Sequence, residues 1–249
     1  MKNKKIGIFD SGIGGITVLR ELLKILPNEN YIYCSDNINA PYGSKTPQLV
    51  ENFCLNIIDL FNANECKLAL IACNTATACA LDSIKQNANM PVIDVVSNGI
   101  QHASEITKNK KICIMATKLT VESKIYLNGL KAINRDFEIS QVKCPKLGGM
   151  IENGWKSENR FKVLQEYMQK IPKNVDTLIL GCTHYPLIKS HIRKNFKKSI
   201  IDPAFRTAIE AKKLLTKKQL INEKGRGSVL FCMNTNMQKI TTLLKLNDL

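Results

Sequence analysis

The chain has 249 residues, of which 44% are hydrophobic, and it carries a formal net charge of +15. This composition is typical of an ordinary globular protein and excludes disordered and fibrous classes. No apolar run approaches the roughly 18–20 residues that a membrane span needs, and the start MKNKKIGIFD leads directly into a strand pattern without a signal-peptide segment. We therefore expect a cytoplasmic protein without a membrane partner.

The excess of basic residues raises the question of a nucleic-acid partner. Nucleic-acid surfaces usually cluster Lys and Arg with aromatic side chains, whereas the lysines here are scattered over polar helix faces and aromatic residues make up 6% of the chain. The dense run RKNFKK at 193–198 falls where a helix ends, which suits the helix dipole. We expect solvated surface charge that attracts small anions, and no nucleic-acid partner.

The nine cysteines include no CxxC pair and no Cys/His cluster. This pattern argues against a zinc site and against a redox dithiol, so no metal is expected. A free cysteine most often packs as a small core hydrophobe. Cys54, for example, shares a helical face with Val50, Ile57 and Phe61, and we expect it in the core.

Strand patterns alternate with helix-period segments along the chain. Strands are predicted at 5–10, 30–36, 67–73, 91–96, 111–117, 137–144, 177–182, 199–202 and 228–234, and helices between them include 16–26, 76–86, 120–133 and 160–171. Strands this apolar are buried on both faces, and their alternation with helices predicts parallel sheets with right-handed crossovers.

A weak internal repeat suggests two similar α/β halves. KKIGIFDSG at 4–12 parallels KKICIMATK at 110–118, and in each half a later strand ends in a thiol. Ligands of parallel sheets bind at the carboxyl ends of the strands. Hydrogen-bonding residues gather at five such ends: Asp10-Ser11, Ser35-Asp36, Cys73-Asn74-Thr75, Thr117 and Cys182-Thr183-His184.

The two matched thiols suggest paired acid–base groups. Cys73 and Cys182 each precede a predicted helix N-terminus, which we expect to lower the thiol pKa below about 8.5. With Asp10 and His184 as proton partners, one thiolate and one thiol could move a proton from one face of a carbon to the other. A Cys–His hydrolase is the main catalytic alternative, but it leaves the second thiol without a role.

Other residues have competing interpretations. The glycine-rich DSGIGGITVL fails the dinucleotide pattern at Thr17, and it lacks the lysine of a phosphate-binding loop. Such a glycine turn can still bind a carboxylate. A structural role for His184 and a surface position for Glu152 stay open. Trp155 is expected to pack or to act as a lid, and His102 and His191 to lie on the surface.

Five segments resemble the glutamate racemases of the aspartate/glutamate racemase superfamily. They are IGIFDSGIGG (6–15), SDNINAPYGSKT (35–46), ACNTATA (72–78), ATKLTVES (116–123) and LGCTHYPL (180–187). The resemblance covers most of residues 5–215. It implies two pseudo-symmetric parallel-sheet α/β domains that face each other across a central cleft, the first formed by 1–97 plus 203–249 and the second by 98–202.

The same resemblance implies a cofactor-independent and metal-independent proton transfer at the α-carbon of glutamate, which supplies D-glutamate for peptidoglycan and so for cell wall and cell shape. Cys73 would take the α-proton from D-glutamate and Cys182 from L-glutamate, assisted by Asp10 on one side and by His184 with Glu152 on the other. The implied substrate-binding residues are Ser11, Pro41, Tyr42, Gly43, Ser44, Asn74, Thr75, Thr117, Thr120 and Thr183. A homodimer is compatible with the sequence.

Two departures from the family pattern keep alternatives open. Ser97-Asn98 stands where the family has an acidic residue before a turn, and Lys146 with Gly148-Gly149 replaces a bulky apolar stretch. We expect both departures near the cleft. The alternatives are a racemase of aspartate or another acidic amino acid and, from a different class, a non-catalytic binder on a degenerate racemase fold.

Overall fold

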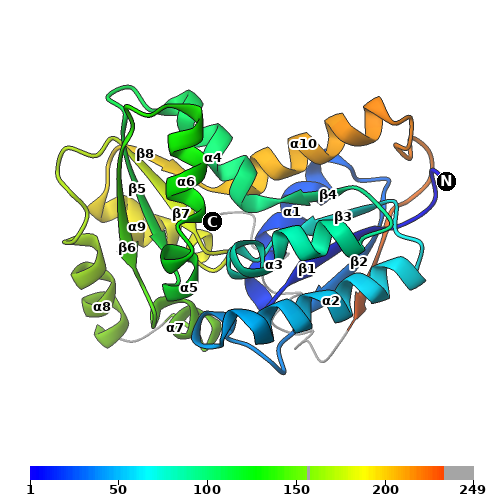
Figure 1. Ribbon diagram of the computed structural model, residues 1–249, viewed down its shortest axis with the longest axis horizontal. Coiled ribbons are helices and arrows are strands. Elements are labelled where there is room, and N and C mark those ends of the chain that lie inside the picture. The colour runs from blue at the N-terminus through cyan, green and yellow to red at the C-terminus, as the bar shows by residue number, and fades with distance from the viewer. Residues whose placement is uncertain (156–157, 233–249) are drawn as a thin grey trace.

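Two parallel β-sheets with helices in their connections make up the protein (Figure 1). The computed structural model describes residues 1–155 and 158–232. Every neighbouring strand pair is parallel, as predicted. The strands are β1 (Ile6–Asp10), β2 (Asn30–Ser35), β3 (Leu68–Ile71), β4 (Val92–Asp94), β5 (Lys111–Ala116), β6 (Glu138–Lys143), β7 (Thr177–Gly181), β8 (Ser199–Ile201) and β9 (Ser228–Cys232).

The strand orders confirm the predicted pseudo-symmetry. The first sheet runs β4-β3-β1-β2-β9 and the second β6-β5-β7-β8. Matching β5, β6, β7 and β8 with β1, β2, β3 and β4 turns the order of the second sheet into β2-β1-β3-β4. This is the order of the first four strands of the first sheet, read in reverse. Strand β9 is the addition, and it pairs with β2 at the edge of the first sheet. The matching strands β3 and β7 lead into Cys73 and Cys182, respectively.

Several helices begin directly after a residue whose side chain caps the helix N-terminus. Thr46, Asp94 and Asp202 each accept a hydrogen bond from a backbone N–H in the first turn of the helix that follows. The helices are α1 (Ile16–Ile25), α2 (Pro47–Ala63), α3 (Asn74–Asn87), α4 (Val95–Ile106), α5 (Lys118–Glu122), α6 (Ile125–Ile133), α7 (Leu147–Glu152), α8 (Glu158–Met168), α9 (Lys189–Asn195) and α10 (Pro203–Lys217), with short 3-10 helices η1 (Ile13–Gly15), η2 (Tyr42–Ser44) and η3 (Tyr185–Ile188).

Two predicted elements are wrong in detail. The strand predicted at 91–96 ends at Asp94, because this carboxylate accepts from Ser97 N at 2.7 Å and caps α4. The single helix predicted at 120–133 is two helices, α5 and α6, because Lys124 adopts a left-handed conformation with φ of 59°. Residues 233–234 of the last predicted strand lie outside the described residues.

One hydrophobic cluster joins the two sheets through helices α4 and α10. It contains Ile8 of β1 and Ile114 of β5, together with Ala103 of α4 and Ala208 of α10, all fully buried. The predicted domain boundary at 97/98 falls within α4, and the one at 202/203 lies at the start of α10. This division therefore stays a prediction. Cys54 is fully buried in another cluster, as predicted.

No helix in residues 1–155 and 158–232 is long and apolar enough to cross a membrane.

Candidate active site

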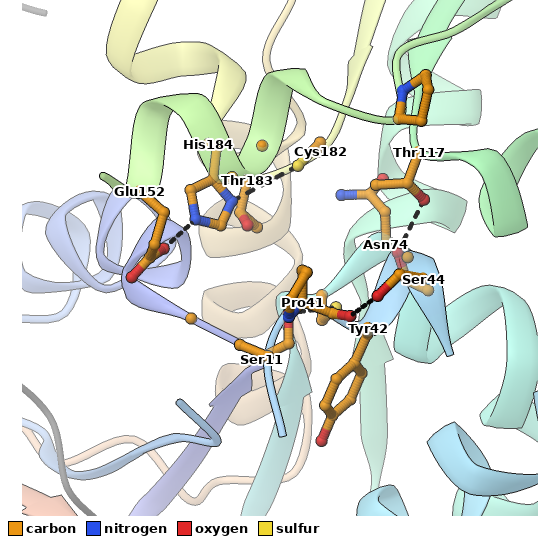
Figure 2. Close-up of a pocket in the computed structure, with 18 of the residues that line it drawn as sticks. Ser11, Pro41, Tyr42, Ser44, Asn74, Thr117, Glu152, Cys182, Thr183 and His184 are labelled. Atoms are coloured by element: carbon orange, nitrogen blue, oxygen red, sulfur yellow. Dashed lines mark hydrogen bonds and ion pairs between the residues drawn. The ribbon is translucent and has the colours of Figure 1, made fainter. Parts of the chain in front are cut away.

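A cavity of about 350 Å³ lies between the two sheets (Figure 2). Residues that follow β1, β2 and β3 of the first sheet line it, as do residues that follow β5, β6 and β7 of the second, so it forms where the carboxyl ends of strands meet. Its lining residues are Ser11, Gly12, Asn37, Ala40, Pro41, Tyr42, Gly43, Ser44, Cys73, Asn74, Thr75, Thr117, Cys144, Pro145, Gly148, Gly149, Glu152, Asn153, Cys182, Thr183 and His184.

Cys73 reaches the cavity from the N-terminus of α3, which it caps. Its sulfur accepts from Ala76 N and donates to Ser11 Oγ, each at 3.4 Å. Burial nevertheless raises the pKa of this thiol to about 12, and the nearby Asp10 carboxylate adds to the rise. The expected lowering at Cys73 is therefore wrong for the free protein. The two hydrogen bonds favour the thiolate but do not offset its removal from water.

Cys182 lies on the opposite domain beside an imidazole–carboxylate pair. The Cys182 sulfur is 3.6 Å from His184 Nδ1, and His184 Nε2 contacts Glu152 Oε2. Burial alone lowers the pKa of His184, but the contacts with Cys182 and Glu152 outweigh it and raise that pKa well above its ordinary value. A protonated ring donates through both nitrogens, which fits a position between a sulfur and a carboxylate.

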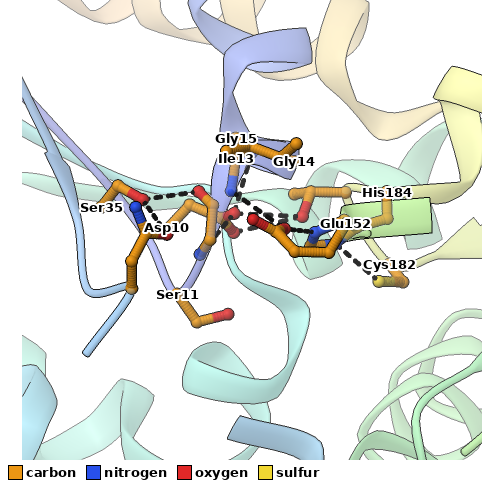
Figure 3. A network of polar contacts seen from close by, with 12 residues as sticks. Asp10, Ser11, Ile13, Gly14, Gly15, Ser35, Glu152, Cys182 and His184 are labelled. Atoms are coloured by element: carbon orange, nitrogen blue, oxygen red, sulfur yellow. Dashed lines mark hydrogen bonds and ion pairs between the residues drawn. The ribbon is translucent and has the colours of Figure 1, made fainter. Parts of the chain in front are cut away.

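Glu152 also joins the two domains. Its carboxylate accepts from Ile13 N at 3.3 Å, in the turn after β1 (Figure 3). The surface position considered for Glu152 is therefore wrong, because this side chain lines the cavity between η1 and His184.

Asp10 is fully buried behind the cavity and does not line it. Its carboxylate accepts from Gly12 N at 3.2 Å and Gly15 N at 2.9 Å, and from Thr183 Oγ1 at 3.2 Å. Burial raises the pKa of Asp10, although the His184 charge and the two glycine N–H groups oppose this. Asp10 thus holds the loop after β7 against the turn after β1 (Figure 3).

The loop after β2 forms another wall of the cavity. Tyr42 OH donates to Asp36 Oδ2 at 2.7 Å, and both residues are buried. Gly43 lies against the other domain, since a Cβ there would be 3.1 Å from Thr117 Cβ. The absence of a side chain at Gly43 therefore allows the two domains to approach each other at this wall.

The start of α3 is bound to the second domain by side-chain hydroxyls. Thr75 Oγ1 lies 2.9 Å from Thr117 Oγ1, which is 2.9 Å from Thr120 Oγ1. Tyr126 OH donates to Asn74 Oδ1 at 2.7 Å. Thr120 is fully buried and does not line the cavity. It could therefore affect a ligand only indirectly, through its hydrogen bonds with Thr117 and Thr75.

The structure brings all but two of the predicted site residues to the cavity wall. The exceptions are Asp10 and Thr120, which touch wall residues from behind. The sequence interpretation missed Gly12, Asn37, Ala40, Cys144, Pro145 and Asn153 as lining residues. Cys144 directly follows β6, so the rule that placed ligands at strand ends could have identified it.

The two sequence departures lie in different places. Gly148 and Gly149 line the cavity, as expected, and a Cβ on Gly148 would be 3.8 Å from Cys182 Sγ. The expectation for Ser97-Asn98 is wrong, because these residues line a separate open groove beside α10. They belong to the first turn of α4, because β4 ends at Asp94, two residues earlier than predicted.

Three further side chains lie outside the cavity wall, and Trp155 packs, one of the two roles expected for it. Trp155 packs edge-on against Phe161 and His191, whose rings stack at a centroid distance of 5.0 Å. His191 therefore belongs to an aromatic group at a partly exposed surface. His102 is half-buried on α4, and burial lowers its pKa.

Apart from His184, the cavity offers neutral donors rather than cations to a ligand. No Lys or Arg is among its described lining residues, and Glu152 and His184 are the titratable side chains there besides the cysteines and Tyr42. In residues 1–155 and 158–232, no group of three or more His, Cys, Asp or Glu side chains could hold a metal ion. An anionic ligand would therefore meet hydroxyls, amides and the N-terminal N–H groups of the 14-residue helix α3.

Comparisons with known proteins show one consistent family. The family model for Asp/Glu/Hydantoin racemase matches residues 6–210. A glutamate racemase of Fusobacterium nucleatum is 45% identical over 233 residues, which are 92% of this chain and 88% of that protein. Glutamate racemase 3 of Caldanaerobacter subterraneus is 36% identical over 251 residues, 99% of this chain and 91% of that protein.

A solved structure has the same fold over the whole chain. The crystal structure of glutamate racemase from Francisella tularensis in complex with D-glutamate superposes with a TM-score of 0.92 at 31% identity. The match covers 100% of this chain and 96% of that one.

Proposed function

Since the chain belongs to the Asp/Glu/Hydantoin racemase family and is an amino-acid racemase, we propose that it interconverts L-glutamate and D-glutamate by a two-thiol proton transfer without a cofactor. One observation carries the proposal: a buried thiol from each half of the molecule lines one cavity of about 350 Å³. The curated relatives named glutamate racemase support glutamate as the substrate.

The proposed reaction starts with one thiolate and one thiol. When D-glutamate binds, the Cys73 thiolate takes the α-proton, and the Cys182 thiol gives its proton to the opposite face of the α-carbon. L-glutamate leaves, with Cys73 now a thiol and Cys182 a thiolate, and the reverse direction runs the same transfers backward. Both Cys73 and Cys182 are more than nine-tenths buried, so the carbanion forms away from water.

Partners on each side assist the thiols. At the Cys182 side, the His184 imidazole lies beside the sulfur and is itself in contact with the Glu152 carboxylate. At the Cys73 side, the Ser11 hydroxyl is hydrogen-bonded to the sulfur, and Ala76 N at the start of α3 donates to it. Because Asp10 opposes ionisation of Cys73, we propose that the ammonium group of the substrate supplies the missing positive charge there.

Neutral donors hold the substrate in this proposal. The α-carboxylate and amine would contact Ser11, Asn74, Thr75, Thr117 and Thr183, supported by Thr120 from behind, and the side-chain carboxylate would lie against Pro41, Tyr42, Gly43 and Ser44. Donors arranged before the reaction stabilise the charge that develops on the carboxylate when the α-proton leaves. All of these residues except Thr120 line the cavity.

Proton exchange in deuterated water tests the proposal. The protein is incubated with L-glutamate, the α-proton signal is followed by NMR, and D-glutamate is measured by chiral chromatography. Wild type should exchange the proton and form D-glutamate, whereas Cys73→Ser and Cys182→Ser should lose racemisation by about 10²–10⁴-fold. Exchange of L-aspartate alone would make the protein an aspartate racemase, and binding of either amino acid without exchange would favour the binder alternative.

The cellular role is proposed on the same basis. The product D-glutamate would supply peptidoglycan synthesis in the cytoplasm. Expression of the chain should restore growth of a bacterium that requires external D-glutamate, and cell fractionation should recover the protein with the cytoplasm. Sedimentation equilibrium would distinguish a monomer from the homodimer that the sequence allows.

A further inference from the structure

The first residue of α3 has its side chain held by the other half of the molecule. Asn74, next to Cys73, receives a hydrogen bond from Tyr126 OH to its Oδ1 atom at 2.7 Å. Tyr126 lies on α6, in the second half of the chain, and its side chain is fully buried. The contact therefore joins a wall residue of the cavity to a helix that does not line it.

The hydroxyl proton fixes which way the amide of Asn74 points. Burial raises the pKa of Tyr126 well above its ordinary value, so the phenol keeps its proton. In the described part of the chain, the Tyr126 hydroxyl donates this proton to Asn74 Oδ1. The carbonyl oxygen must then face Tyr126, and the amide nitrogen, which can only donate, is left to the cavity side. Asn74 enters the cavity on the side away from Glu152 (Figure 2).

The contact lies beside the break between α5 and α6, where Lys124 has a φ of 59°, a conformation that is uncommon for a residue with a side chain. Before the break, the hydroxyls of Thr117 and Thr120 lie against Thr75 Oγ1. After it, Tyr126 of α6 donates to Asn74. Both residues that follow Cys73 are therefore held by the second half of the molecule.

We propose that Tyr126 is a positioning residue for the racemase reaction: its hydroxyl orients the Asn74 amide so that the amide nitrogen donates to the substrate carboxylate. Without the hydroxyl, the amide can rotate by half a turn and present its oxygen to the carboxylate, which repels it. The inference rests on the proposed function, because the acceptor in the cavity is taken to be the carboxylate of glutamate.

A double-mutant cycle tests whether Tyr126 acts through Asn74. Tyr126→Phe removes only the hydroxyl, and it should lower kcat/KM for L-glutamate by about tenfold, the effect of one buried hydrogen bond. In the Asn74→Ala background the same substitution should change kcat/KM by less than about twofold, since the amide is already gone. Equal losses in both backgrounds, or an unchanged kcat/KM for Tyr126→Phe, would overturn the proposal.

A matched control separates positioning from loss of stability. Tyr31 is also fully buried, and its OH donates to the Leu26 carbonyl at 2.7 Å, remote from the cavity wall. Tyr31→Phe should lower the unfolding temperature as Tyr126→Phe does but leave kcat/KM unchanged. A fall in kcat/KM of the same size for both variants would mean that stability, not the Asn74 amide, explains the effect.

Failure of the proposed function can be told apart from failure of this inference. If wild type does not racemise glutamate, the proposed function is wrong, and the same cycle is measured with D-glutamate dissociation constants by calorimetry. Weaker binding by Tyr126→Phe only when Asn74 is present supports the positioning role. Binding that is indifferent to Tyr126, or no binding of D-glutamate at all, contradicts it.

Discussion

The two thiol sides of the cavity occupy matching places in a repeated fold, but their chemical surroundings differ. Cys73 follows β3 and caps a 14-residue helix, and its sulfur donates to a serine hydroxyl and accepts from a backbone N–H. Cys182 follows the matching strand β7, and its sulfur contacts an imidazole that is itself in contact with a carboxylate. The short 3-10 helix after Cys182 receives no side-chain cap.

This difference shows that the repeat specifies where a thiol lies and not how it is activated. The Cys73 side relies on uncharged donors and, in our proposal, on the charge of the bound substrate. The Cys182 side contains its own positive charge on His184, whose pKa is raised well above its ordinary value. Since the enantiomers of glutamate have equal free energies, a variant that weakens one side must lower kcat/KM by the same factor in both directions.

Alkylation of Cys73 would test the contrast most strongly. Because burial raises the pKa of this thiol to about 12, its thiolate fraction should rise about tenfold for each pH unit between about pH 7 and about pH 10. The rate of Cys73 modification by iodoacetamide, followed by peptide mass spectrometry, should therefore rise about 1000-fold. Ser11→Ala removes the side-chain hydrogen bond that lowers the pKa of Cys73, so it should slow the reaction at every pH. A rate that levels off below about pH 9 would contradict this view of the Cys73 side.

Removal of the imidazole should disable the Cys182 side. His184→Gln is expected to lower kcat/KM by about 10²–10⁴-fold, and equally for L-glutamate and D-glutamate. Contacts with Cys182 and Glu152 raise the pKa of His184 well above its ordinary value, and the ring loses its proton as the pH rises through that raised pKa. The alkaline decline of kcat/KM that this causes in wild type should be absent from the variant. Glu152→Gln keeps the imidazole and should lower kcat/KM by a smaller factor. An equal loss of kcat/KM in both variants would indicate that the Glu152 carboxylate, and not the imidazole alone, is needed at the Cys182 side.

A methyl group added at Gly14, where the two halves are in contact, should push the Cys73 side and the Cys182 side apart. A Cβ on Gly14 would lie 2.4 Å from Thr183 Oγ1 and 2.9 Å from His184 N. Because backbone cannot move aside as a side chain can, Gly14→Ala should displace the loop of Cys182 and lower kcat/KM by about 10²-fold. Gly12→Ala would meet the mobile end of Glu152 at 2.8 Å, so a smaller loss is expected. Steady-state kinetics on both variants make the comparison, and the reverse order would contradict it.

Among these variants, Asp10→Asn should have the smallest effect. It should lower the stability of the protein by weakening the contact between the Cys73 side and the Cys182 side. The amide keeps one acceptor oxygen, so it cannot accept at both Oδ2, which Gly12 N and Gly15 N use, and Oδ1, which Thr183 Oγ1 uses. We expect a loss of about 1–3 kcal/mol in the free energy of unfolding, measured by urea titration.

The pH dependence of that loss has a definite sign. Folding raises the pKa of Asp10, so its contribution to stability is fully present below the unfolded pKa of about 3.9 and is lost as pH rises through the folded value. The stability difference between wild type and Asp10→Asn should therefore grow as the pH falls. A difference that shrinks on acidification would show that the carboxylate is stabilised in the folded protein.

The sequence by itself determined the elements, the parallel sheets and most of the cavity wall. Apolar strands alternate with amphipathic helices, and parallel strands end at one edge of a sheet, so Cys73, Thr117, Cys182 and their neighbours could be assigned to one site from their positions after strands. These inferences depend on local periodicity and on a general property of parallel sheets. The comparisons then confirmed the family that the motifs had indicated.

Only the tertiary structure decided how the two halves meet. The bonds of Asp10 with Thr183, of Glu152 with Ile13 and of Asn74 with Tyr126 join residues 173, 139 and 52 positions apart. The break at Lys124 and the raised pKa of Cys73 likewise escaped prediction. Such features depend on which groups are buried together, and burial arises from the packing of distant segments that no local pattern specifies.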